Sequence, residues 1–318
     1  MFATSFISNA IKRSAENPAD RRRFLALAGA GAAGVAGGSY LATAGIAEAA
    51  TTEKAAHGPS DAAVLNFALN LEYLEAEFYS HAVYGEGLSD RDTDTKDKHG
   101  NVVHGGPVVG GRKVRLTGAV RDYACEIAND EIAHVKFLRS ALGSAKVSRP
   151  SIDLRASFNA AAKAAGLISG NQTFDPFADE NSFLLGAFIF EDVGVTAYKG
   201  AAPLISNKTY LEAAAGILAV EAYHASTIRT TLFAKGLTAP AQKISDARDS
   251  LDGSTDLDQG LVKDGRANIV PTDANGVAFS RSANQVLNIV YLNPKKVTKG
   301  GFFPQGVNGS INTSGGAA

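Results

Sequence analysis

Apolar side chains recur with the period of an α-helix in four segments of the chain, at residues 61–85, 124–142, 183–201 and 214–232. Residues three, four and seven positions apart share one face of a helix, so each segment is expected to bury one stripe. Each stripe also contains ionisable side chains. The first and third segments hold a central glutamate, and the second and fourth hold a glutamate followed by a histidine three positions later. The pattern predicts four amphipathic helices with charged groups on their buried faces.

Glu72 is the charged residue in the middle of the first stripe. The positions that share its face are all apolar or aromatic: Leu65, Ala68, Leu69, Ala76, Tyr79 and Val83. An ionised carboxylate in such a stripe is costly unless it is paired or bound to a metal ion. Glu75 lies about 60° from this face and Glu77 about 140°, so we expect these two beside the site or in solvent. Glu72 is therefore the candidate ligand.

The third segment repeats this arrangement around Glu191. The residues at the corresponding positions are Leu184, Ala187, Phe188, Val195 and Tyr198. Both buried glutamates are thus followed seven positions later by a tyrosine. Two unrelated amphipathic helices would share these positions only by coincidence, so we interpret Glu191 as the partner of Glu72.

The second and fourth segments match each other in the same way. Glu131 and His134 are three positions apart, as are Glu221 and His224. Side chains with this spacing project from one helix face, so both can reach one ion. The surrounding residues also correspond, in the pairs Ala124 and Ala214, Ile127 and Ile217, Arg139 and Arg229, and Leu142 and Leu232. Two such motifs, each after a helix with a buried glutamate, predict a paired metal site.

The order Glu, ExxH, Glu, ExxH resembles the ferritin-like superfamily. The segments LNLEYLEAEFY, DEIAHVKFLRSAL and VEAYHASTIR are similar to the branch that includes the plant desiccation-related proteins, over about residues 60–236. The resemblance implies an all-α fold, an antiparallel four-helix bundle with a long crossover between its second and third helices. It also implies two divalent metal ions, iron or manganese with zinc less favoured. The six implied ligands are Glu72, Glu131, His134, Glu191, Glu221 and His224.

Four further residues are candidates to support these ligands. Asp130 and Asp192 each adjoin a ligand and are expected to accept hydrogen bonds from imidazole N–H groups. Tyr79 and Tyr198 are expected one to two turns from the ligands. Three roles are open for the tyrosines: hydrogen bonding to the carboxylates, redox relay, and packing alone.

The N-terminal residues are expected to carry an export signal. Arg21, Arg22 and Arg23 precede Phe24-Leu25 and an apolar Ala/Gly-rich run, and Ala47-Glu48-Ala49 fits a cleavage site. Residues 1–49 are therefore predicted to be a twin-arginine signal peptide that engages the twin-arginine export machinery and directs the folded protein to the periplasm. An uncleaved membrane anchor stays open as the alternative.

The charge of the remaining chain excludes one class of partner. Residues 1–49 hold five basic and three acidic residues, which leaves 26 basic against 29 acidic, a net charge of about −3. A near-neutral chain does not attract nucleic acid as its main partner. The single cysteine, Cys125, has no partner for an internal disulfide. A homodimer is compatible with the sequence, which does not decide the oligomeric state.

The predicted bundle, residues 60–236, is interrupted twice and extended once. A polar, Gly-rich insertion covers residues 86–118, and the crossover covers 144–178 with a short helix at 157–166. The extension, residues 237–318, is expected to be irregular with one helix near 279–291 and a loosely attached end, GVNGSINTSGGAA.

Three functions fit such a protein. Two ions held by shared carboxylates suit oxidoreductase chemistry on O2 or peroxide, of oxidase, peroxidase or catalase type. The resemblance to desiccation-related proteins implies instead a non-catalytic metal-binding protein that protects against stress. The third alternative is a bundle that serves as a scaffold for partners in the cell envelope.

Overall fold

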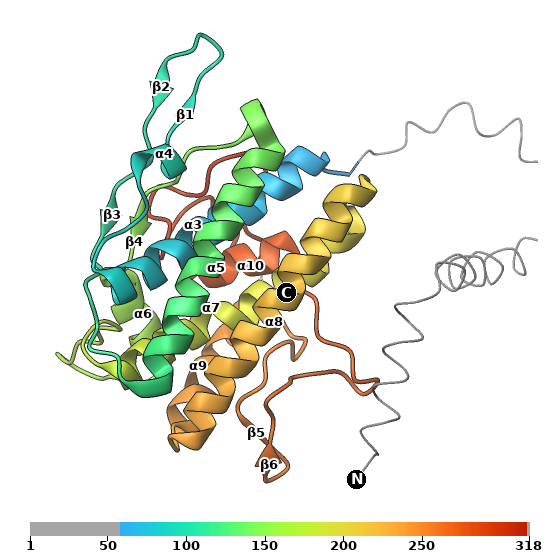
Figure 1. The fold of residues 1–318 in the computed structure, drawn as a ribbon. Helices are drawn as coiled ribbons and strands as arrows, with labels where there is room; N and C mark the ends of the chain where they lie inside the picture. Colours follow the sequence, from blue (N-terminus) through green and yellow to red (C-terminus); the bar gives the residue numbers. More distant parts are fainter. Residues whose placement is uncertain (1–57, 317–318) are drawn as a thin grey trace, which may run out of the picture. The chain divides into compact units, whose positions relative to one another are not determined.

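The computed structural model describes residues 58–316, so the predicted signal peptide lies outside the described residues. Four long helices form the centre of the molecule (Figure 1): α3 (Asp61–Tyr84), α5 (Gly118–Leu142), α7 (Glu180–Ala201) and α8 (Lys208–Ala234). Helix α3 packs along α5, and α7 packs along α8. The first turns of α3 lie beside the end of α5, where Asn66 donates to the Ala145 carbonyl. Lys235 and Glu180 likewise join the end of α8 to the start of α7. The predicted all-α bundle with antiparallel helix pairs is confirmed.

Capping side chains fix where three of these helices begin. The hydroxyl of Ser60 accepts from the Ala63 amide at α3, and Asp179 accepts from two amides at the start of α7. Asn207 does the same at α8. These groups satisfy amides that have no partner within the helix. Helix α3 ends at Tyr84 and is capped by Gly85, whose φ of 87° favours glycine and allows its amide to bond back to the last turn.

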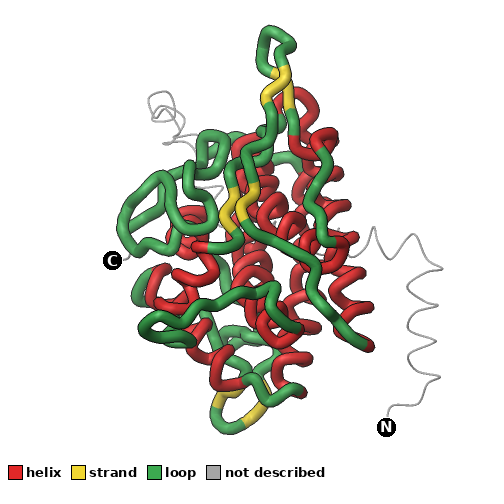
Figure 2. The backbone as a smooth tube through the Cα atoms, turned by 90° about the vertical axis from the view of Figure 1, so that its left-hand side faces the viewer, coloured by secondary structure: helices red, strands yellow, loops and turns green. Residues whose placement is uncertain are grey.

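The insertion and the crossover lie against each other on one side of the bundle (Figure 2). The insertion contains α4 (Asp90–Thr93), a hairpin of β1 (Thr95–Lys96) and β2 (Val102–Val103), and β3 (Val108–Val109). After α5 come η1 (Gly143–Ala145), β4 (Ile152–Asp153), which pairs in parallel with β3, and α6 (Ala156–Ala164). Helix α6 occupies the position of the short helix expected at 157–166.

The C-terminal extension is more ordered than expected. Short η2 (Ala202–Leu204) separates α7 from α8, and the extension itself contains α9 (Thr238–Asp252), a hairpin of β5 (Val262–Lys263) and β6 (Arg266–Ala267), and α10 (Ala283–Val290). Helix α10 matches the stretch expected near 279–291, but α9 was not expected. The expectation of a loosely attached end was wrong, because Val307 and Ser314 are buried and Asn308 exchanges hydrogen bonds of 2.9 and 2.8 Å with Asn70.

Helix α9 was not expected because charged residues occupy its buried face. Its buried face carries Arg248 and Asp252, which look like solvated positions in the sequence. In the structure they belong to a continuous series of ion pairs, which we call the Arg–Asp ladder: Arg229–Asp192 (2.6 Å), Asp192–Arg248 (3.0 Å), Arg248–Asp258 (2.7 Å), Asp258–Arg281 (2.9 Å) and Arg281–Asp252 (2.5 Å). Buried charges are tolerated because each is paired. The ladder fastens the extension to α7 and α8.

The correspondence between the two helix pairs extends to these covering segments. Arg139, eight positions after Glu131, donates to the Tyr73 hydroxyl and to the carbonyls of Arg91 and Asp94 in the insertion. Arg229, eight positions after Glu221, donates to Asp192 and to two carbonyls of the extension. Each ExxH helix therefore anchors the segment that covers its own side of the bundle.

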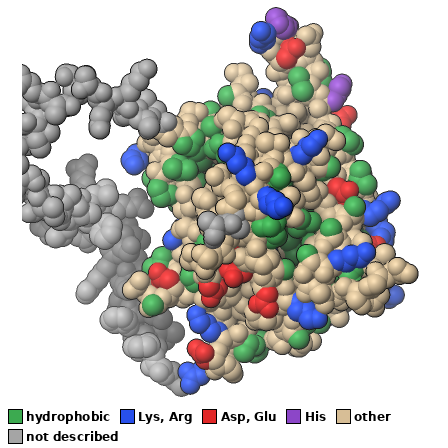
Figure 3. All heavy atoms as spheres, turned by 180° about the vertical axis from the view of Figure 1, so that it is seen from behind, with side chains coloured by type: hydrophobic (Ala, Val, Ile, Leu, Met, Phe, Trp, Pro, Cys, Tyr) green, Lys and Arg blue, Asp and Glu red, His purple; other side chains and the backbone are tan. Residues whose placement is uncertain are grey.

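The surface carries charges of both signs. On the face shown in Figure 3, basic and acidic side chains are interspersed, and the projecting β1–β2 hairpin carries histidine and basic groups near its end. None of the helices between residues 58 and 316 is both long enough and apolar enough to span a bilayer.

Candidate metal centre

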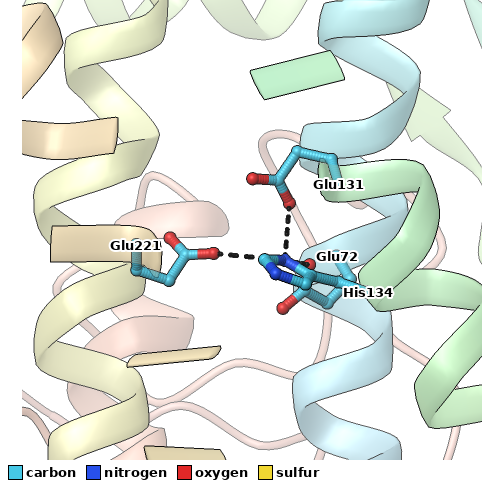
Figure 4. Close-up of side chains that lie close together, drawn as sticks. All are labelled: Glu72, Glu131, His134 and Glu221. Carbon is cyan, nitrogen blue, oxygen red and sulfur yellow. Dashed lines mark hydrogen bonds and ion pairs between the residues drawn. The ribbon is translucent and has the colours of Figure 1, made fainter. Parts of the chain in front are cut away.

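The six predicted ligands converge inside the bundle. Glu72, Glu131, His134 and Glu221 point toward one another (Figure 4), and their ligand atoms all lie within 4.8 Å of one another. Glu131 forms a second group of the same kind with Glu191 and His224. All six side chains are buried. Glu131 belongs to both groups, as a carboxylate shared by two ions would.

The donor atoms of this cluster fit divalent cations. Both oxygens of Glu131, both oxygens of Glu221, one oxygen of Glu191 and Nδ1 of His224 are buried without a hydrogen-bond partner. His224 Nδ1 nevertheless lies 3.0 Å from Glu131 Oε1. Unpartnered buried polar atoms cost free energy, and most native structures avoid them. Converging oxygen and imidazole donors, several of them without a hydrogen-bond partner, are the arrangement that two metal ions would satisfy.

Asp130 supports one imidazole, whereas Asp192 does not. Asp130 Oδ2 lies 3.1 Å from Nε2 of His224, so this nitrogen faces a carboxylate while Nδ1 faces the cluster. A carboxylate at the outer nitrogen orients the ring and fixes its tautomer. Asp192 was expected in the same role, but its carboxylate lies on Arg229 and Arg248 in the Arg–Asp ladder. Its position next to Glu191 turns it about 100° around α7, away from both histidines.

The two tyrosines bond crosswise between the helices. The Tyr79 hydroxyl on α3 donates to Glu191 Oε1 on α7, and the Tyr198 hydroxyl on α7 donates to Glu72 Oε1 on α3. Of the three roles left open by the sequence, the structure therefore displays the hydrogen-bonding role. Each hydroxyl holds one oxygen of a carboxylate, and the other oxygen faces a histidine Nδ1, at 3.2 Å for Glu72 and 3.7 Å for Glu191.

Glu75 and Glu77 are both buried, for different reasons. Glu75 borders the cluster, since the carboxylates of Glu131, Glu191 and Glu72 act with burial to raise its pKa well above its ordinary value. Glu77 was expected beside the site or in solvent, but it is fully buried and pairs with Arg149. The expectation failed because the insertion and the crossover cover this face of α3, which the helix alone cannot reveal.

The buried carboxylates of the cluster favour the binding of protons or cations. Burial raises the pKa of Glu72 to about 7 and that of Glu191 to about 8. Burial also opposes the charge of both imidazoles, but the neighbouring carboxylates raise the pKa of His134 to about 11 and that of His224 to about 9. Although burial disfavours its charge, the two imidazoles lower the pKa of Glu131 to about 2. Without metal, protons neutralise the site.

These shifts predict the pH dependence of stability for metal-free protein. Between the ordinary value of 4.5 and about 7 to 8, Glu72 and Glu191 hold protons in the folded state that the unfolded chain has lost. Above pH 6.5 the two histidines likewise keep protons in the folded state that the unfolded chain has lost. The free energy of unfolding therefore falls as the pH rises from about 5 to about 9. Thermal unfolding in the presence of a chelator measures this slope.

The stabilisation that bound metal gives should increase with pH. Divalent ions displace the same protons, so their stabilising effect grows with pH over this range. The difference in melting temperature between loaded and chelated protein is expected to widen steadily. A melting temperature of chelated protein that increased across the same range would contradict the protonation assigned to the site.

Comparisons with known proteins agree with this geometry. A family model described as "Ferritin-like domain" matches residues 60–234. The chain is 30% identical over 270 residues to the desiccation-related protein PCC13-62 of Craterostigma plantagineum. The aligned region covers 79% of this chain and 83% of that protein. It is also 26% identical over 271 residues to the ferritin-like catalase Nec2 of Nesocodon mauritianus, and this aligned region covers 79% of the chain and 85% of Nec2.

Proposed function

Because the chain belongs to the ferritin-like domain family, we propose that it is a di-metal carboxylate protein that consumes peroxide. The resemblance expected from the sequence is confirmed by the family match and by both relatives. The observation that carries the proposal is the convergence of six buried Glu and His side chains, four of which hold donor atoms without a hydrogen-bond partner. A relative named as a ferritin-like catalase favours peroxide over other oxidants.

The residues would divide the work as follows. Glu72, His134 and Glu221 would hold one ion, Glu191 and His224 the other, and Glu131 would contribute to both. When bound, a pair of redox-active ions would supply or accept the electrons that peroxide chemistry needs. Tyr79 and Tyr198 hold the two single glutamates in place, and Asp130 holds His224. Mixed oxygen and imidazole donors favour iron or manganese.

A second function is supported by the other relative. The name of the Craterostigma plantagineum protein connects it with desiccation, which favours a metal-binding protein that protects against stress without rapid turnover. In either case we propose that residues 1–49 direct the protein through the twin-arginine machinery to the periplasm, so that metal is acquired before export. Export of a folded protein suits a buried centre.

Peroxide turnover with three different metals separates these functions. Protein loaded with manganese or iron is expected to consume hydrogen peroxide, because both ions change oxidation state readily. Zinc accepts the same ligands but has no redox chemistry, so zinc-loaded protein is the matched control and should be inactive. Oxygen release and peroxide loss are measured together. If no loading produced turnover above the zinc control, the proposal of an enzyme would fail and metal-binding protection would remain.

A further inference from the structure

The two helix pairs differ at one position that adjoins the centre. Three positions after Glu72, α3 carries Glu75, whereas three positions after Glu191, α7 carries Gly194. A Cβ atom at Gly194 would lie 2.3 Å from Glu221 Oε2 and 3.5 Å from Glu75 Oε1. Both carboxylates therefore approach bare backbone. The absence of a side chain on α7 makes the room that Glu221 occupies, with Glu75 beside it.

A small cavity between the bundle and the C-terminal extension borders Glu75 and Gly194. Its volume is about 20 Å³, and its walls come from α3, α7 and the C-terminal extension, with Leu71, Leu74, Ile189, Val193, Ile289 and Phe302 among them. Among the side chains that line it, Glu75 is the polar one. A space of this size accommodates a molecule about as large as water. Its apolar walls disfavour ions, because charge is costly to remove from water.

The extension forms the outer wall of this cavity. The Phe302 amide donates to the Val290 carbonyl at 2.9 Å, and its ring packs against Phe190 and Phe158 with centroids 4.9 and 5.0 Å apart. Helix α10 contributes Ile289 and Val290. These contacts fix the position of the wall that the extension contributes.

Other approaches to the centre are filled by side chains or lined by charged groups. The cavity of about 70 Å³ along α7 and α8 is of the second kind, because Asp192, Arg229 and Asp258 line it. At the seam between α5 and α8 stand the rings of His134 and His224, with centroids 6.4 Å apart and Asp130 outside them. Toward the end of α3, Tyr79 packs edge-on against Phe78 and Phe183, and all three rings are almost fully buried. The apolar cavity is therefore the side on which a small neutral molecule meets the fewest charged or bulky groups.

We propose that this cavity is the entry site for a small uncharged ligand of the metal centre, and that Glu75 is the first polar group to contact it. The ligand class is a molecule with one or two heavy atoms and a hydrogen-bonding group, such as hydrogen peroxide, rather than an anion or a bulky organic peroxide. The inference rests on the proposed function for the identity of the ligand. The path itself rests on the cavity, Gly194 and Glu75.

Nitric oxide tests the path without turnover. It is small and uncharged, and its binding to Fe(II)-loaded protein is followed by stopped-flow absorbance. Val193→Phe places a ring in the cavity and should slow this binding about tenfold or more, because the ring must be displaced from a packed site. Val277→Phe is the matched control, since Val277 is an exposed residue of the extension that does not line this cavity, and the rate should stay near wild type. Equal rates in the two variants would overturn the entry site.

Glu75 is tested with two substitutions that keep or remove its hydrogen bonds. Glu75→Leu should lower kcat/KM for hydrogen peroxide about tenfold, the size of one lost hydrogen bond, and leave nitric oxide binding nearly unchanged. Glu75→Gln should restore much of the peroxide rate. Loss of metal in Glu75→Gln would make Glu75 a ligand and overturn this assignment. If wild-type protein consumed no peroxide but Val193→Phe still slowed nitric oxide, the entry site would stand and the proposed function would fail.

Discussion

Glu131→Gln is expected to lose metal from both halves of the centre, whereas Glu191→Gln should retain about one of the two ions that a di-metal bundle holds. The difference follows from the geometry, because Glu131 belongs to both groups of converging ligands and Glu191 to one. An amide is neutral and offers one oxygen, so it cannot replace a carboxylate shared by two cations. Elemental analysis of protein purified from its own host measures the metal content per chain.

The matched control for this experiment lies on the same helix. Glu126 is exposed on α5, five positions before Glu131, so Glu126→Gln removes the same charge without touching the cluster. It should retain the metal content of the wild type. Full metal content in Glu131→Gln would show that the ligand assignment is wrong, and equal losses in Glu131→Gln and Glu191→Gln would show that the two half-sites are filled only together.

Asp258→Ala should be among the most destabilising single substitutions in the C-terminal extension. Asp258 accepts from Arg248 at 2.7 Å and from Arg281 at 2.9 Å, and all three side chains are buried. Its removal leaves three buried guanidinium groups, those of Arg229, Arg248 and Arg281, with only the carboxylates of Asp192 and Asp252. Breaking a buried ion pair in this way costs about 3–5 kcal/mol. Urea unfolding of metal-free protein measures the change in the free energy of unfolding.

An exposed ion pair supplies the comparison. Lys235 and Glu180 lie 2.9 Å apart at the ends of α8 and α7, and about a third of the Lys235 side chain is exposed. Lys235→Met should therefore change stability by about 1 kcal/mol or less. If Asp258→Ala cost no more than Lys235→Met, water would reach the Arg–Asp ladder and the extension would not be fastened by it.

The helices and the six Glu and His side chains that converge between them could be predicted because both depend on local periodicity. A helix places positions three, four and seven apart on one face, so a glutamate in an apolar stripe marks itself as abnormal. The correspondence between the two helix pairs added a second, independent test. The sequence also shows where the two helix pairs differ, because Glu75 and Gly194 occupy equivalent positions, three residues after Glu72 and Glu191.

The wrong expectations concern residues whose partners lie far away in the chain. Glu77 forms a buried ion pair with Arg149, which is 72 positions away. Asp192 forms ion pairs with Arg229 and Arg248. Helix α9 looked polar because Arg248 and Asp252 occupy its buried face. In each case a charge that would be solvated on an isolated helix is neutralised by another segment.

By itself the sequence determined the four helices and the six residues that meet at their centre, because helical periodicity is a local property of the chain. Only the tertiary structure decided which carboxylate belongs to both groups of converging side chains, how Tyr79 and Tyr198 cross between helices, and which segments enclose the centre. These features depend on contacts between residues distant in sequence. Pairing between buried charges obeys no spacing along the chain, so it becomes visible only when the segments are packed together.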